Sequence, residues 1–135
     1  MDLIECKKKY FIKEVSIDND KINSILEASK NKLKSEELLP LNEFTANAKI
    51  SLAYDCLREL LEDLALKNQL KIYNHECYTA FLKEIIKDSS LGDDFDTIRK
   101  IRNSINYDGK TITQEECKKI IIKIKYLIEN IRNKI

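Results

Sequence analysis

Apolar residues recur at helical spacing along most of this 135-residue chain. The clearest run extends from Ile50 to Leu64, where they follow the i, i+3, i+4, i+7 pattern of one helix face. Such a face needs packed partners, so the pattern predicts a helix in contact with other helices. Two glycines and one proline also leave few positions for the many tight turns of an all-β fold. We therefore expect an all-α protein.

The length of the chain suits one compact domain. We predict a single domain over residues 1–135, in which residues 1–17 form an N-terminal arm or short helix and residues 18–135 form a bundle. No segment alternates apolar and polar residues for long enough to predict a strand. The expected architecture is an up-and-down bundle of four main helices plus the arm.

Local signals place the ends of the helices. The first helix should begin after Asp18, whose carboxylate can accept a backbone N–H, and end at Leu39, because the residue before a proline avoids the α region. The second helix is expected to begin at Asn42, and the third to cover 75–87 before a break at 88–92. The fourth should run from 93 to Gly109, a left-handed residue that closes the helix. The last should begin with a capping box at Thr113.

The cysteines and the single histidine do not form a metal motif. Cys6, Cys56, Cys77 and Cys117 are widely spaced, and His75 is the only histidine. Because a structural zinc site needs four convergent ligands, we expect no metal and no cofactor, and we expect reduced cysteines buried as small apolar residues. No apolar run approaches the roughly 20 residues that span a bilayer, and the start of the chain lacks a signal-peptide core. The prediction is a cytoplasmic protein without a membrane segment.

A phosphate-binding site in this chain must be a local cluster, because 24 Lys+Arg residues are balanced by 23 Asp+Glu residues. The best candidate lies in the stretch before Gly109. On a helix, Arg99, Arg102 and Asn106 fall on one side. Arg102 also lies between two apolar positions, so its guanidinium should emerge at the edge of the buried face, where a cation needs a partner.

Two kinds of partner could satisfy Arg102. The internal candidates are the carboxylates of Asp55, Glu59 and Glu62 on the long helix, and this pairing predicts a structural ion-pair network. The external candidate is a phosphate of RNA or of a nucleotide, since arginine binds phosphate in a bidentate manner, asparagine can hold a ribose or a base edge, and tyrosine can stack. In that case the binding residues would be Arg99, Arg102, Asn103, Asn106 and Tyr107.

The order of several segments resembles the prokaryotic HEPN-domain family, small helical proteins often encoded beside a minimal nucleotidyltransferase. The segments are Glu5–Val15, Ala53–Glu62, Tyr73–Glu76 and Ile101–Gly109. The resemblance covers most of the chain and implies a homodimer with the arginine-containing helices facing a cleft. It also implies a nucleotidyltransferase partner, in a pair of the toxin–antitoxin or defence type. Active members are metal-independent endoribonucleases whose signature is an arginine, a polar residue and, a few residues later, a histidine.

Arg102 and Asn103 match the first two positions of that signature, whereas Asn106 and Tyr107 stand where the histidine is expected. Neither exchanges a proton readily near neutral pH, so binding without cleavage is the leading expectation. The alternative is an endoribonuclease whose catalytic residues would be Arg102, Asn103 and Tyr107, and His75 could approach them in space. The resemblance also suggests Tyr107 as a target for nucleotide modification by the partner. A third alternative is a structural helical adaptor.

Overall fold

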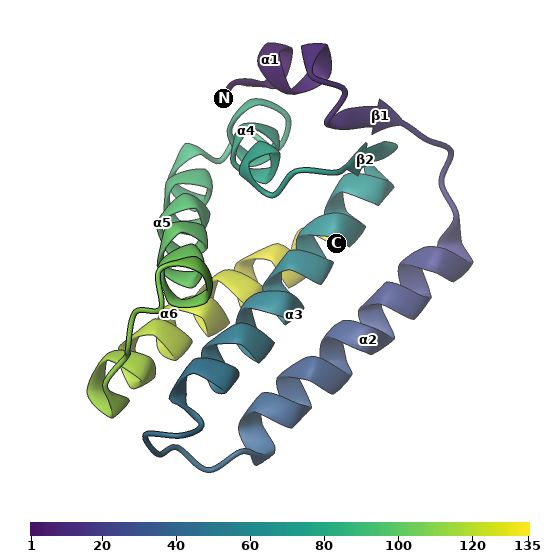
Figure 1. Ribbon diagram of the computed structural model, residues 1–135. Coiled ribbons are helices and arrows are strands. Elements are labelled where there is room, and N and C mark those ends of the chain that lie inside the picture. The colour runs from purple at the N-terminus through teal and green to yellow at the C-terminus, as the bar shows by residue number, and fades with distance from the viewer.

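The computed structural model describes residues 1–135 as six helices and one small sheet (Figure 1). The all-α prediction is confirmed, because the only other regular structure is a pair of three-residue strands. No helix is both long enough and apolar enough to cross a membrane. The elements are α1 (Leu3–Lys8), β1 (Ile12–Glu14), α2 (Asn19–Leu38), α3 (Ala46–Lys67), β2 (Leu70–Ile72), α4 (Glu76–Glu84), α5 (Ser89–Tyr107) and α6 (Gln114–Arg132).

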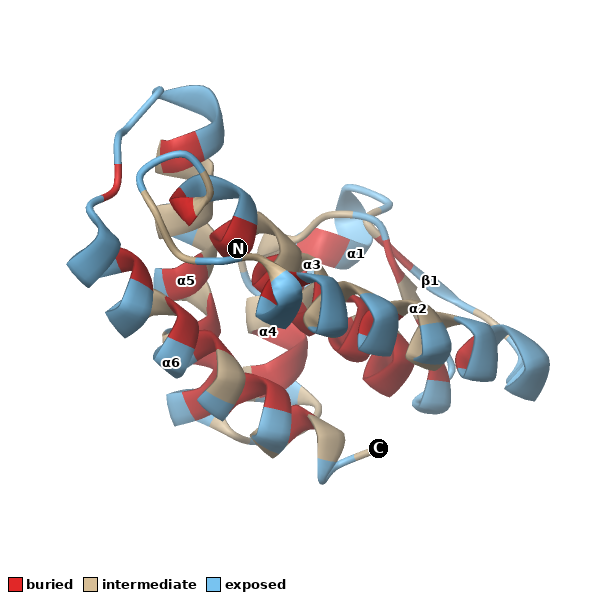
Figure 2. Cartoon of the chain, turned by 90° about the horizontal axis from the view of Figure 1, so that it is seen from below, coloured by how far each residue is buried: buried red, intermediate tan, exposed pale blue.

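The central element is α3, which packs against α2 and α6, while α4 packs against α5. The apolar stripe from Ile50 to Leu64 is buried, as predicted. A hydrophobic cluster of 30 buried residues includes members from every element except α2. That helix contacts the cluster through the half-buried Leu26 and Leu33, and its outer face is exposed (Figure 2). The bundle is therefore centred on α3.

The predicted caps are largely confirmed. Asp18 Oδ1 accepts from the backbone N–H of Lys21 at 3.1 Å, and α2 ends at its C-cap residue Leu39. The capping box at Thr113 is present at the start of α6. Gly109 adopts a positive φ of 67°, the left-handed conformation expected where a helix closes.

Three predicted boundaries are wrong by about one turn. The helix expected across 75–87 ends at Glu84. The helix expected from Asn42 begins at Ala46, because the Asn42 side chain accepts backbone N–H groups of the preceding turn instead of capping the helix. The break predicted at 88–92 is the first turn of α5. Asp88 Oδ1 accepts from the backbone N–H of Leu91 at 3.0 Å and so caps the helix start.

The prediction of no strand is also wrong. β1 and β2 pair antiparallel, with Ile12 opposite Ile72 and Glu14 opposite Leu70. Each strand has only three residues, which is too short for the period-two pattern to stand out. The pairing attaches the N-terminal arm to the segment between α3 and α4 (Figure 1).

The expectation of four reduced cysteines is wrong for one pair. Cys6 on α1 and Cys77 on α4 form a disulfide, whereas Cys56 and Cys117 are free and buried. The bonded residues lie 71 positions apart in the sequence. No local spacing signals such a pairing, because it depends on where the arm folds back.

Candidate functional site

Arg102 lies in the second half of α5 and faces a ring on α3. Its guanidinium carbon is 5.2 Å from the centroid of the Tyr54 ring, within the range of a cation–π interaction. One turn further along α5, the amide oxygen of Asn106 accepts from Arg102 Nε at 3.0 Å in the amide orientation that satisfies both groups. The structure thus brings Arg102 and Asn106 together and holds the guanidinium in a defined position.

The single histidine reaches the same ring from another part of the chain. Tyr54 Oη and His75 Nδ1 are hydrogen bonded at 3.3 Å. His75 occupies the N-cap position of α4, but its side chain makes no capping hydrogen bond. The Asn74 side chain does so instead, by accepting from the backbone N–H of Glu76 at 2.9 Å. We call the group formed by these four residues the Tyr54 cluster: Tyr54, His75, Arg102 and Asn106.

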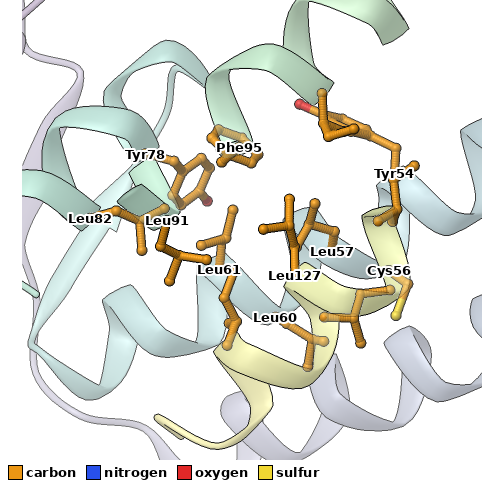
Figure 3. Packing of buried hydrophobic residues seen from close by; sticks show 14 of the residues in the cluster. Tyr54, Cys56, Leu57, Leu60, Leu61, Tyr78, Leu82, Leu91, Phe95 and Leu127 are labelled. Carbon is orange, nitrogen blue, oxygen red and sulfur yellow. The ribbon is translucent and has the colours of Figure 1, made fainter. Parts of the chain in front are cut away.

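Buried aromatic rings pack against the Tyr54 cluster from the side of the hydrophobic core. The Tyr54 ring stacks on Phe95 with centroids 6.3 Å apart, and Phe95 meets Tyr78 edge-on at 6.2 Å. Figure 3 shows Phe95 between the two tyrosines at one side of the core. His75 completes the group, with its ring 6.1 Å from Tyr54 and 6.2 Å from Tyr78. Because Tyr54 and Phe95 are fully buried, the ring under Arg102 is a rigid support.

The cluster contains two neutral titratable groups in a positive environment. Burial raises the pKa of Tyr54 to about 12, against a smaller opposing effect of nearby arginines. Burial also lowers the pKa of His75, and the arginines lower it further. Near pH 7 the phenol and the imidazole are therefore uncharged. The charged groups that act on both are Arg58, Arg99, Arg102 and Asp55, three cations and one carboxylate.

Arg102 is the only one of the four arginines without a carboxylate within 4 Å. The others pair in the following way: Arg58 with Glu59 and Glu62, Arg99 with Asp96, and Arg132 with Glu129. Arg102 is nevertheless half-buried between its aromatic support and Asn106. The guanidinium has thus lost part of its hydration without gaining an internal anion, which favours an anion from outside.

The carboxylates predicted to satisfy Arg102 are used elsewhere. Glu59 pairs with Lys32 of α2, and Glu62 pairs with Lys71 of β2 at 2.6 Å. The prediction fails because α2 and β2 bring lysines to the acidic side of α3. Asp55 is half-buried and forms no ion pair. It affects the cluster only because its charge raises the pKa of Tyr54 and of His75.

The remaining predicted residues do not join Arg102. Arg99 lines a separate hollow of about 540 Å³ between the first two residues of the chain, α4 and α5, and its Nη2 is 2.8 Å from Asp96 Oδ1. Asn103 is half-buried, and Tyr107 is 76% exposed on the last turn of α5. The five residues therefore lie along one helix without forming one site.

Tyr54 is the member of the cluster that sequence reasoning missed, since its place in an apolar stripe is typical of a core residue. From the sequence, His75 is either a cap or packing residue at a helix start or a residue that approaches the site in space. Its side chain does reach the site through Tyr54. No group of three or more His, Cys, Asp or Glu side chains is arranged to hold a metal ion.

Comparison with known proteins gave no match to a family model, to a curated sequence or to a solved structure. The resemblance to HEPN-domain proteins therefore stays a prediction.

Proposed function

We propose that this chain is a HEPN-like module that binds RNA or a nucleotide, and that the Tyr54 cluster holds a phosphate. The observation that carries the proposal is the guanidinium of Arg102, which is fixed over Tyr54 and is the one arginine without a carboxylate within 4 Å. Arginine binds phosphate through two parallel hydrogen bonds, and a guanidinium that is already oriented loses less entropy when it does so.

The second half of α5 offers groups suited to a nucleotide next to that phosphate. Asn106 is exposed beside Arg102, and an amide can hold a ribose hydroxyl or a base edge. Tyr107 follows it with an exposed ring on which a base can stack. A single-stranded RNA that runs along this end of α5 would meet the three side chains in order.

The test is binding of a fluorescently labelled single-stranded RNA, and separately of ATP, by anisotropy between 50 and 200 mM salt, a range suited to counterion effects. Arg102→Ala should weaken binding about tenfold and reduce the slope of log affinity against log salt by about 0.7, the value for one phosphate contact on a single strand. Arg132→Ala, which removes an arginine paired with Glu129, is the matched control and should leave both unchanged. Equal affinity and slope for wild type and Arg102→Ala would refute the proposal and favour a structural adaptor.

A second candidate function is metal-independent cleavage of RNA, favoured by the neutral His75 imidazole beside Arg102. In the tautomer whose Nδ1–H donates to Tyr54 Oη, Nε2 is the nitrogen available to accept the proton of a ribose 2′-hydroxyl. The 2′-oxygen would bond to the neighbouring phosphorus as the bond to the 5′-oxygen breaks, and that oxygen would take up a proton. Arg102 would stabilise the charge on the phosphoryl oxygens.

The same variants test cleavage when they are incubated with mixed RNA in EDTA. Cleavage that is lost in both Arg102→Ala and His75→Ala, and kept in Arg132→Ala, supports the enzyme. Binding of RNA without cleavage, even at high protein concentration, supports the binding module and refutes the enzyme.

The partners proposed for this module rest on the resemblance. They are a minimal nucleotidyltransferase, in a pair of the toxin–antitoxin or defence type, and a second copy of the chain. Exposed apolar residues on the outer face of α6, Ile122 and Tyr126, support association with a protein surface, since such residues are usually covered when they cluster.

A further inference from the structure

The segment that carries His75 is held at both of its ends by the N-terminal arm. On one side, β2 pairs with β1, and the backbone N–H of Tyr73 donates to the Phe11 carbonyl at 2.8 Å. On the other side, the disulfide joins Cys77 to Cys6. His75 lies between these attachments, two residues before the bonded sulfur. The arm thus fixes where the imidazole enters the Tyr54 cluster.

We propose that Cys6 and Cys77 form a thiol–disulfide exchange site for a low-molecular-weight thiol, and that their oxidation state sets the position of His75. Any effect of this exchange on RNA or nucleotide binding rests on the proposed function, whereas the movement of His75 does not. The proposal makes the arm a regulatory element of the cluster.

The exchange is a two-electron reaction. A small thiolate attacks one protein sulfur, the Cys6–Cys77 bond breaks, and the released sulfur takes up a proton. A second small thiolate then attacks the mixed disulfide and releases the other protein thiol. The small-molecule disulfide is the oxidised product, and the two protein sulfurs are reduced. In the opposite direction, a small-molecule disulfide oxidises the pair by the same steps.

Access to the pair depends on local opening of α1. Cys6 and Cys77 are both 0% exposed, so a thiolate cannot reach either sulfur in the closed structure. Yet α1 has only six residues, and Cys6 is the only one of them that is buried. A further attachment of α1 is the backbone N–H of Leu3, which donates to Glu84 Oε2 at 2.7 Å. A short element with so little buried surface opens more easily than the core.

The other two cysteines are protected, so a small thiol should react selectively with the Cys6–Cys77 pair. Cys56 is fully buried in α3, and Cys117 is fully buried in α6, within the hydrophobic cluster. Burial raises the pKa of both thiols, which keeps them protonated and unreactive. Thiol reagents should therefore act on the Cys6–Cys77 pair while the core stays folded.

Release of the bond removes the covalent link between the arm and the first turn of α4. The strand pairing at Ile12 and Ile72 would remain on the side of His75 that leads to β2, while the α4 side would keep only non-covalent contacts with the arm, among them the ion pair between the Met1 amino group and Glu76. The imidazole would keep its 3.3 Å hydrogen bond to Tyr54, and its backbone would still be positioned by the buried part of α4 and by that ion pair. We expect it to become more exposed and to move away from the ring.

The first measurement follows the ring protons of His75 by NMR, where a single histidine gives unambiguous signals. In the oxidised protein the titration midpoint should lie below the ordinary value of about 6.5, and after reduction with dithiothreitol it should move up toward that value, because burial is the main cause of the depression. The groups around the ring that contribute are Arg58, Arg99, Arg102 and Asp55. Cys56→Ser should show the same two midpoints as wild type. An identical His75 titration in both redox states would overturn the proposal.

The second measurement does not require the reduced protein to remain folded. The rate of disulfide reduction by dithiothreitol is followed by mass spectrometry at increasing urea below the unfolding transition. Local opening predicts a rate that hardly changes with urea, because little surface is exposed. A rate that rises with the full denaturant dependence of global unfolding would show a purely structural bond and refute the exchange site.

Discussion

Asp63 on α3 is a fully buried carboxylate, and neither of its oxygens has a hydrogen-bond partner. Burial raises its pKa to about 7, helped by the negative charges of Glu62 and Glu59 and opposed by Lys67. Between its ordinary pKa of 3.8 and pH 7, the folded protein holds a proton that the unfolded chain has released. The free energy of unfolding therefore falls as pH rises through this interval, by at most about 4 kcal/mol, and is level above it.

Asp63→Asn should remove this pH-dependent loss of stability and make the protein more stable than wild type at pH 8. The gain should be smaller at pH 5, where Asp63 is already protonated in the fold. Urea unfolding at the two pH values measures the effect. His75 contributes with the opposite sign, because its lowered pKa costs stability as pH falls below 6.5, so only the difference between variant and wild type isolates Asp63.

The control for this substitution is Asp108→Asn, which changes an exposed carboxylate at the end of α5 and should have the same small effect at both pH values. A variant at Asp63 that is less stable than wild type at pH 8, or that shows no pH-dependent difference, would contradict the account of this residue.

Individual site residues were only partly predictable. The helical spacing of Arg102 and Asn106 was sufficient to place them together, because both lie on one element. The carboxylates considered as internal partners of Arg102 do not pair with it, because Lys32 and Lys71 reach Glu59 and Glu62 from other elements. Nothing in a single sequence indicates which of several cations forms an ion pair with a given carboxylate.

At the scale of elements, a buried ion-pair network connects the end of α2 to α3 and α6. Glu36 is 2% exposed, with Oε1 3.2 Å from Lys49 Nζ and Oε2 3.3 Å from Lys125 Nζ. Lys49 Nζ also donates to the carbonyls of Glu36 and Leu39 at 2.7 and 2.8 Å. Both carbonyls lie at the end of α2. The Glu36 carbonyl also accepts from the backbone N–H of Leu39, whereas the Leu39 carbonyl lies beyond the helix and has Lys49 as its partner.

Lys49→Met should destabilise the protein by about 3 kcal/mol, because it leaves the buried Glu36 carboxylate with one partner and the Leu39 carbonyl with none. The measurement is the free energy of unfolding in urea. Lys123→Met, on an exposed position of α6, should change it by less than about 0.5 kcal/mol. If the two variants are equally stable, the network does not hold α2 in place.

The long helices were the most predictable elements, because caps and apolar stripes are local signals. The sheet and the disulfide were not, since each joins the arm to a segment more than 50 residues away. The start of α5 was missed for a different reason: Asp88 and the residues after it favour both a turn and a helix N-terminus, and here they form the latter.

At the scale of the whole molecule, the Tyr54 cluster lies where three distant segments meet. Tyr54 comes from α3, His75 from the start of α4, and Arg102 with Asn106 from α5. The arm holds the second of these segments through β1 and the disulfide. Periodicity identifies which faces are buried but not which faces meet, so the cluster depends on the tertiary fold.

The most direct test of the phosphate site is the NMR signal of His75 during addition of single-stranded RNA to the oxidised protein. A phosphate held by Arg102 brings negative charge close to the imidazole, so the ring signals should shift with saturation and the pKa of His75 should rise. The same addition to Arg102→Ala should leave both nearly unchanged. Wild-type signals and a pKa that stay constant while RNA is added to saturating concentration would contradict a phosphate site at the Tyr54 cluster.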